Sequence, residues 1–201
     1  MRTVWTVLSL TLCLLVSACG GGDQPAADPS VSPTSIAQLD SGTMRVVRVA
    51  FCDLVPRAAV RSALGAASSR TRSWRNGDSV PDAGGGIGHE FGCAWFAPRG
   101  RAARAWVFAR PVSRSFATTL VRRAASDRGC SATPSKLFGK PSVVQTCHRS
   151  GSPVRIRHAG LFGDTWLTCE VSGPSTRTTL RKRADAWCVS VANALNAGQA
   201  S

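Results

Sequence analysis

Six of the eight cysteines are spread between residues 52 and 188 of this 201-residue chain, and they constrain its fold more than any other feature. They are Cys52, Cys93, Cys130, Cys147, Cys169 and Cys188. The other two, Cys13 and Cys19, lie within or just after an apolar N-terminal segment. An even number of cysteines in an exported domain is typical of a disulfide framework. We therefore expect three disulfides if the chain leaves the cytoplasm.

The first 18 residues have the features of an export signal. Arg2 precedes the apolar run VWTVLSLTLCLLV at 4–16. This run is shorter than the roughly 20 residues that a membrane-spanning helix needs, and it fits the core of a secretory signal. We expect residues 1–18 to be removed, Cys13 with them. Residues 20–42, rich in Gly, Pro, Ala and Ser, predict a disordered tether that follows Cys19.

The stretch Val16-Ser17-Ala18-Cys19 resembles the lipobox of bacterial lipoproteins. The resemblance implies that Cys19 is acylated, becomes the mature N-terminus and anchors the chain in the lipid bilayer, on the outer face of the cytoplasmic membrane. Two or more acyl chains give a stable anchor where one does not. The alternative is an ordinary signal peptide with a chance cysteine.

Hydrophobic periodicity predicts a single α+β domain over residues 43–197, with a short tail at 198–201. Helices are expected at 54–65, 114–128 and 176–196. Strands are expected at 44–51, 89–96, 104–112, 142–148, 153–160 and 164–172. Short turns between strands favour an antiparallel sheet, and we expect about three helices to pack on one face of it.

The order of these elements favours one set of disulfides. Six cysteines allow fifteen connectivities. Cys169 alternates with apolar residues of its strand and so faces inward, while Cys188 lies on the apolar side of the last helix. Proximity along the chain then favours Cys52–Cys93, Cys130–Cys147 and Cys169–Cys188.

The cysteine and tryptophan pattern resembles a large group of actinobacterial lipoproteins. In that group a Cys-Asp-Leu-Leu stretch opens a helix and a later Cys-x-Trp closes on it; this chain has CDLVPRAAVRSALG and then GCAW. The later stretches GLFGDTWLTCEV and RADAWCVSVANAL also fit. Val55 departs from the pattern, because the group usually has a capping Thr or Ser there. The group is mostly uncharacterised, so the resemblance implies a cell-envelope lipoprotein and offers no catalytic residues.

The charge of the chain predicts an anionic partner. The formal net charge is +14, and without Arg2 and the three aspartates before residue 43 the domain carries 24 basic and 8 acidic residues. A GC-rich genome would favour arginine over lysine codons, but it does not explain the scarcity of acids. Such a domain is attracted to anionic lipids, to phosphate-bearing wall polymers or to an acidic envelope protein. Nucleic acid is not expected as a physiological partner of an exported chain.

The densest basic cluster is SSRTRSWRNG at 68–77. Arg70, Arg72, Trp74 and Arg75 alternate there with small polar residues between the first helix and a Gly-rich segment. One interpretation is an anion-contacting loop in which Trp74 stacks on a sugar or packs among lipid headgroups. The other is a solvated loop with Trp74 tucked under it.

Residue patterns for catalysis are missing from the sequence. There is no Gly-x-Ser-x-Gly, Cys-x-x-Cys or His-Glu-x-x-His motif, so we expect no metal or cofactor. The histidines are His89, His148 and His158. His89 beside Glu90 and His148 beside Cys147 are isolated pairs, and they predict structural or surface roles. These observations favour a non-catalytic binding or sensing module. The alternatives are a small envelope hydrolase with a dispersed site and a carrier of an apolar lipid.

Overall fold

The structure is a computed structural model that describes residues 35–80 and 86–197. The predicted signal peptide, the lipidation site Cys19, the first part of the predicted tether and the tail at 198–201 lie outside the described residues. The core includes Ile36, which lies within the predicted tether and is 7% exposed. Ile36 belongs to a short 3-10 helix, η1 (Ile36–Gln38), that packs against the last helix.

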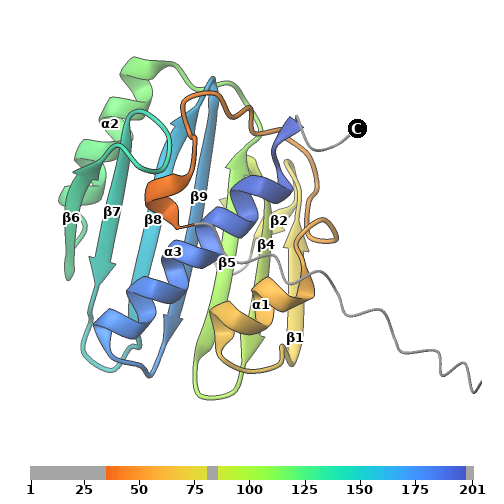
Figure 1. Cartoon of the computed structure of the whole chain (residues 1–201), viewed down its shortest axis with the longest axis vertical. Coiled ribbons are helices and arrows are strands. Elements are labelled where there is room, and N and C mark those ends of the chain that lie inside the picture. The colour runs from red at the N-terminus through yellow and green to blue at the C-terminus, as the bar shows by residue number, and fades with distance from the viewer. Residues whose placement is uncertain (1–34, 81–85, 198–201) are drawn as a thin grey trace, which may run out of the picture. The chain divides into compact units, whose positions relative to one another are not determined.

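A seven-stranded antiparallel sheet and three α-helices make up the domain, which confirms the predicted α+β class (Figure 1). The strand order is β1-β4-β5-β9-β8-β7-β6. The helices are α1 (Arg57–Leu64), α2 (Arg114–Ala125) and α3 (Arg177–Ala194). The strands of the sheet are β1 (Arg70–Trp74), β4 (Glu90–Ala97), β5 (Arg101–Phe108), β6 (Cys130–Ser135), β7 (Ser142–Cys147), β8 (Val154–Phe162) and β9 (Thr165–Gly173). A separate two-stranded ribbon is formed by β2 (Ser79–Val80) and β3 (Gly86–Ile87).

Helices α1 and α3 cover one face of the sheet (Figure 1). Trp187 of α3 is 1% exposed and meets Trp95 of β4 edge to face, with ring centroids 5.2 Å apart. Its indole Nε1 donates a hydrogen bond of 3.0 Å to the carbonyl of Arg104. A buried tryptophan with its N–H satisfied in this way fixes the position of α3 over the centre of the sheet.

Helix α2 packs on the opposite face, so the expectation that all helices share one face is wrong. Ala117 of α2 belongs to a second apolar cluster with Val143, Leu161 and Trp166. These sheet residues alternate with those that face α3, and they provide an apolar patch over β7, β8 and β9 on the far side. The apolar stripe of α2 predicted that it packs on the sheet but did not indicate which face.

All three predicted disulfides are confirmed. Cys52–Cys93 joins the segment before α1 to β4, and Cys169–Cys188 joins β9 to α3. Cys130–Cys147 joins directly opposite positions of β6 and β7. Each bridge joins two cysteines that are consecutive among the six, which explains why proximity along the chain predicted the connectivity.

The strand expected at 44–51 does not form in the sheet. Met44, Val46 and Phe51 are buried, but Val46 makes only an isolated bridge to Asn196 at the end of α3. The backbone N–H of Val47 donates to the carbonyl of Leu195 at 3.0 Å. The apolar alternation of this segment therefore reflects packing along the C-terminal end of α3.

Candidate binding surface

One face of the sheet carries a set of charged side chains on the side away from α1 and α3. Cys169 points toward α3 through its disulfide, so Glu170, the next residue of β9, points the other way. Strand register places the outward residues of β1, β4, β5 and β8 on the side of Glu170, and we call this surface the open face. Its charged residues are Arg70, Arg72, Glu90, Arg104, Arg155, Arg157 and Glu170. Among the described helices, α2 contacts β6, β7 and β8 on this side.

Guanidinium groups lie over two aromatic rings of the open face, those of Phe96 and Trp106. Arg70 Cζ lies 4.3 Å from the ring centroid of Phe96, and Arg104 Cζ lies 5.4 Å from the same centroid. Arg157 Cζ lies 5.2 Å from the centroid of Trp106. Cation–π contacts of this kind contribute about 0.5–1 kcal/mol each at exposed sites. Because arginines already lie over these two rings, the rings are not free to stack on a partner. The groups that this part of the surface presents are the N–H donors of the arginines.

Glu170 lies at the centre of three of these arginines. Its Oε1 accepts a hydrogen bond of 3.0 Å from Arg104 Nη1, and its Oε2 accepts one of 3.0 Å from Arg157 Nε. Arg155 Nε lies 3.6 Å from Oε2, within ion-pair range but too far for a hydrogen bond. The Glu170 side chain is 3% exposed, whereas those of the three arginines are 25–33% exposed. The carboxylate therefore lies beneath a layer of guanidinium groups that reach solvent.

This cluster keeps a positive charge after Glu170 has been neutralised. Burial by itself would raise the pKa of Glu170, but the charges of Arg157, Arg155 and Arg104 outweigh burial and hold that pKa below its ordinary value. One anion and three cations leave two positive charges. A guanidinium has five N–H donors, so the two carboxylate oxygens do not exhaust the donors of the cluster. The remaining donors suit an oxyanion such as phosphate.

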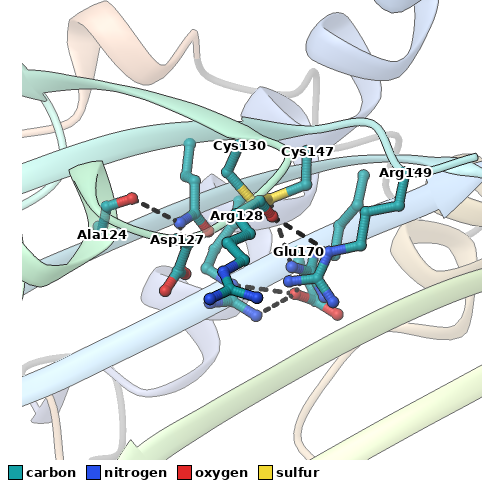
Figure 2. Close-up of a disulfide and its surroundings, with 10 residues drawn as sticks. Ala124, Asp127, Arg128, Cys130, Cys147, Arg149 and Glu170 are labelled. Atoms are coloured by element: carbon teal, nitrogen blue, oxygen red, sulfur yellow. Dashed lines mark hydrogen bonds and ion pairs between the residues drawn. A yellow bond between two sulfur atoms is a disulfide. The ribbon is translucent and has the colours of Figure 1, made fainter.

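The Cys130–Cys147 disulfide borders the open face (Figure 2). Arg155 Nη2 donates to Cys147 Sγ at 3.3 Å, so Arg155 contacts both the disulfide and Glu170. Arg128 and Arg149 extend from the two sides of the disulfide toward the side of Glu170, and Arg149 Nε donates to the carbonyl of Arg128 at 3.2 Å (Figure 2). The basic surface thus continues from the centre of the sheet to this disulfide.

Three of the four residues predicted to contact an anion lie on the open face. Residues 70–74 form the edge strand β1 where a loop was expected, because they pair with β4 along their whole length. Arg70, Arg72 and Trp74 alternate onto the face, and Arg75 follows the strand at an exposed position. Their contact with an anion stays a prediction.

Trp74 is tucked against the sheet. Its ring atoms occupy the space that a side chain at Gly92 would fill, and its Nε1 donates to Glu90 Oε1 at 3.3 Å. Burial raises the pKa of Glu90, and the hydrogen bond from Trp74 partly offsets that rise. The geometry therefore matches the second of the two interpretations of Trp74, since the ring packs on the chain itself.

Sequence reasoning did not identify the centre of the open face. Arg104, Arg155, Arg157 and Glu170 lie in three strands, and only strand register brings them together. The sequence did contain one indication of this site. Cys169 was predicted to point inward, and the next residue of a strand points to the opposite face, so Glu170 could have been predicted to point outward. The partners of Glu170 across the sheet required the strand order, which the sequence did not provide.

Two hollows on the surface of the described residues bear on the hydrolase alternative. One of about 560 Å³ lies beside α1 and β1, and its lining includes one acid, Asp53. One of about 390 Å³ lies at the start of α3 and is lined by Thr146, Ile156, Arg177, Thr178, Arg181 and Lys182. Neither hollow has the pair of carboxylates that glycoside hydrolysis requires.

The packed interior bears on the lipid-carrier alternative. Large buried side chains such as Trp187, Leu167 and Phe51 fill the space between the sheet and helices α1 and α3, which a lipid carrier would leave open.

A histidine and an acid do meet, but inside the fold. His158 Nε2 of β8 lies 2.8 Å from Asp185 Oδ1 of α3, although the atoms are poorly aligned for a hydrogen bond. His158 is 2% exposed and lines neither hollow, so the pair joins α3 to the sheet.

Within 35–80 and 86–197 no group of three or more His, Cys, Asp or Glu residues is placed to hold a metal ion. In the same ranges no helix combines the length and apolarity that crossing a membrane requires.

Comparisons with known proteins show no family for this chain. No family model matches the chain, and no curated protein matches it. Among solved structures, the extracellular domain of PknH from Mycobacterium tuberculosis is similar to this chain, with 15% sequence identity and a TM-score of 0.48. The match covers 76% of this chain and 99% of that domain.

Proposed function

We propose that this chain is a membrane-anchored extracytoplasmic lipoprotein whose domain binds an anionic polymer of the cell envelope through the open face, without catalysing a reaction. The observation that supports the proposal is the layer formed by Arg104, Arg155 and Arg157 above the buried carboxylate of Glu170. A cluster that retains positive charge and unused N–H donors attracts and orients oxyanions. Three disulfides suit a domain that functions outside the reducing cytoplasm.

The membrane that anchors the chain is the alternative partner, because anionic lipid headgroups carry the same phosphate chemistry as an envelope polymer. The experiment therefore has to distinguish a soluble polymer from a lipid surface.

Binding to inorganic polyphosphate, a soluble polymer of phosphate oxyanions, tests the proposal. We expect the triple variant R70M/R104M/R157M to bind polyphosphate at least tenfold more weakly than the wild type, because it removes charges and donors from the open face. The matched control is R114M/R122M/R123M, which removes the same charge from exposed positions of α2. That control should retain binding within about threefold, a difference that long-range attraction alone can produce.

Two results would overturn this function. Equal losses in the two triple variants would show that only net charge matters. Retention on vesicles of anionic phospholipid, without binding to polyphosphate, would identify the membrane as the partner. Circular dichroism and thermal unfolding of each variant exclude loss of folding as the cause.

A further inference from the structure

The three disulfides differ in their access to solvent. Cys169 and Cys188 are both fully buried, whereas Cys52–Cys93 and Cys130–Cys147 each join a partly exposed cysteine to a buried one. Cys130 is partly exposed, and it lies in β6, the strand at one end of the sheet. A thiol that approaches from solvent can therefore reach Cys130, while its partner Cys147, at 4% exposure, lies beneath.

A cation lies against the sulfur that such an attack would release. Arg155 Nη2 is 3.3 Å from Cys147 Sγ, and Arg149 contributes further positive charge nearby. Positive charge stabilises a thiolate, and a better-stabilised leaving thiolate departs faster in thiol–disulfide exchange. The accessible cysteine and the stabilised leaving sulfur thus belong to the same bridge, whereas Cys93, the buried partner of Cys52, lies within the apolar core.

We infer that Cys130–Cys147 is a redox-controlled disulfide, reduced by a dithiol outside the cytoplasm, and that its reduction weakens anion binding by the open face. The second half of this inference rests on the proposed function. The first half depends only on the geometry of the disulfide.

The reaction is an exchange with a dithiol, and its electrons balance. One thiolate of the dithiol attacks Cys130 Sγ, the bond to Cys147 breaks, and the electron pair leaves on Cys147 as a thiolate beside Arg155. The second thiol of the dithiol loses its proton to solvent and displaces Cys130 from the mixed disulfide. Cys130 takes up a proton, the dithiol becomes a disulfide, and the protein carries two reduced cysteines.

Reduction changes the open face in two ways. The Cys147 thiolate adds a negative charge next to Arg155, which then neutralises a thiolate in place of an external anion. The edge strand β6 also loses its covalent link to β7, so the β6 end of the sheet opens more readily. Both changes reduce the affinity for polyphosphate.

The first test is the order and rate of reduction. Wild-type protein is treated with limiting dithiothreitol, alkylated with iodoacetamide and analysed by peptide mass spectrometry. We expect Cys130 and Cys147 to be alkylated first, with reduction about tenfold slower in R155M and close to wild type in R155K, which keeps the charge. The control R123M removes an exposed charge from α2 and should leave the rate unchanged. Earlier reduction of Cys52–Cys93, or equal rates in R155M and wild type, would overturn the inference.

The second test separates control by reduction from the binding itself. Polyphosphate affinity is measured for oxidised wild type, for C130S, which keeps the Cys147 thiol, and for C130S/C147S, which has none. We expect C130S to bind several-fold more weakly than the double variant above the pKa of the thiol, with the difference vanishing at lower pH. If oxidised wild type does not bind, the proposed function fails while the order of reduction stands. If wild type binds and neither C130S nor mild reduction weakens binding, redox control is refuted and the proposed function stands.

Discussion

Arg157 and Glu170 face one another across β8 and β9, with Arg157 Nη2 2.9 Å from Glu170 Oε2. The contact lies on the side of the sheet opposite the Cys169–Cys188 disulfide, so the two faces of β9 have different roles. The inward side fixes α3 in place. The outward side holds a buried carboxylate that organises arginines at the surface.

Glu170 stabilises the fold in its ionised form, so E170Q should lower the free energy of unfolding at pH 7. We expect a loss of about 2 kcal/mol, less than for a fully buried pair because the arginines reach solvent. The pKa of folded Glu170 lies below the ordinary value of 4.5, so this contribution is complete above that pH. It disappears as the pH falls through the folded pKa. Urea denaturation of both proteins should therefore show curves that converge in acid.

E90Q is the matched control for E170Q and should behave in the opposite sense. Burial raises the pKa of Glu90, so its ionisation at neutral pH disfavours the folded state. Glutamine keeps an oxygen that accepts the hydrogen bond of Trp74. We expect E90Q to be neutral or slightly stabilising at pH 7, and a loss as large as that of E170Q would contradict this account of the two glutamates.

Gly92 is required by the position of Trp74. A methyl group at residue 92 would overlap the Trp74 ring, so G92A should displace the ring and lower the stability by about 1–3 kcal/mol. G86A is the control, because nothing lies within 4 Å of an added Cβ there. Thermal unfolding gives the stability, and tryptophan fluorescence, compared with a W74F background, shows the displacement. An unchanged stability of G92A would show that Trp74 is not packed on β4.

The disulfides should differ in their contribution to stability although two of them close loops of similar length. Cys169–Cys188 and Cys130–Cys147 span 19 and 17 residues, so each should contribute about 3 kcal/mol through chain entropy. C169A/C188A also removes two buried sulfurs between α3 and the sheet, which should add about 1 kcal/mol or more. Urea denaturation of the two double variants measures the difference. A larger loss in C130A/C147A would contradict the assignment of Cys169–Cys188 as the bridge that fixes the core.

The sequence was sufficient for those parts of the fold that depend on local pattern. The three helices were predicted close to their bounds because apolar stripes and caps such as Ser113 mark them. The disulfides were predicted because each joins two cysteines that are consecutive among the six. The strand at 44–51 was wrong because alternation does not distinguish packing along a helix end from pairing in a sheet. Strands β1 and β6 were missed because they are edge strands with many polar residues, so neither has a strong apolar face.

The candidate site depended on information that single-sequence patterns do not contain. Arg104 and Glu170 are 66 residues apart in the chain and meet only because β5 pairs with β9. The net positive charge indicated an anionic partner, but it did not indicate a location. Arg70, Arg72 and Trp74 were identified because they are adjacent in one strand, which is the local part of a surface that is otherwise assembled by topology.

The central claim is that the open face binds polyanions, and NMR mapping on the isotope-labelled wild-type protein tests it most directly. Polyphosphate is titrated while backbone amide and arginine side-chain signals are followed. We predict that the largest shifts fall on Arg70, Arg104, Arg155 and Arg157 and on their strands, and that they diminish as salt is added. Shifts concentrated instead at the start of α3, around Arg177, Arg181 and Lys182, would contradict the account.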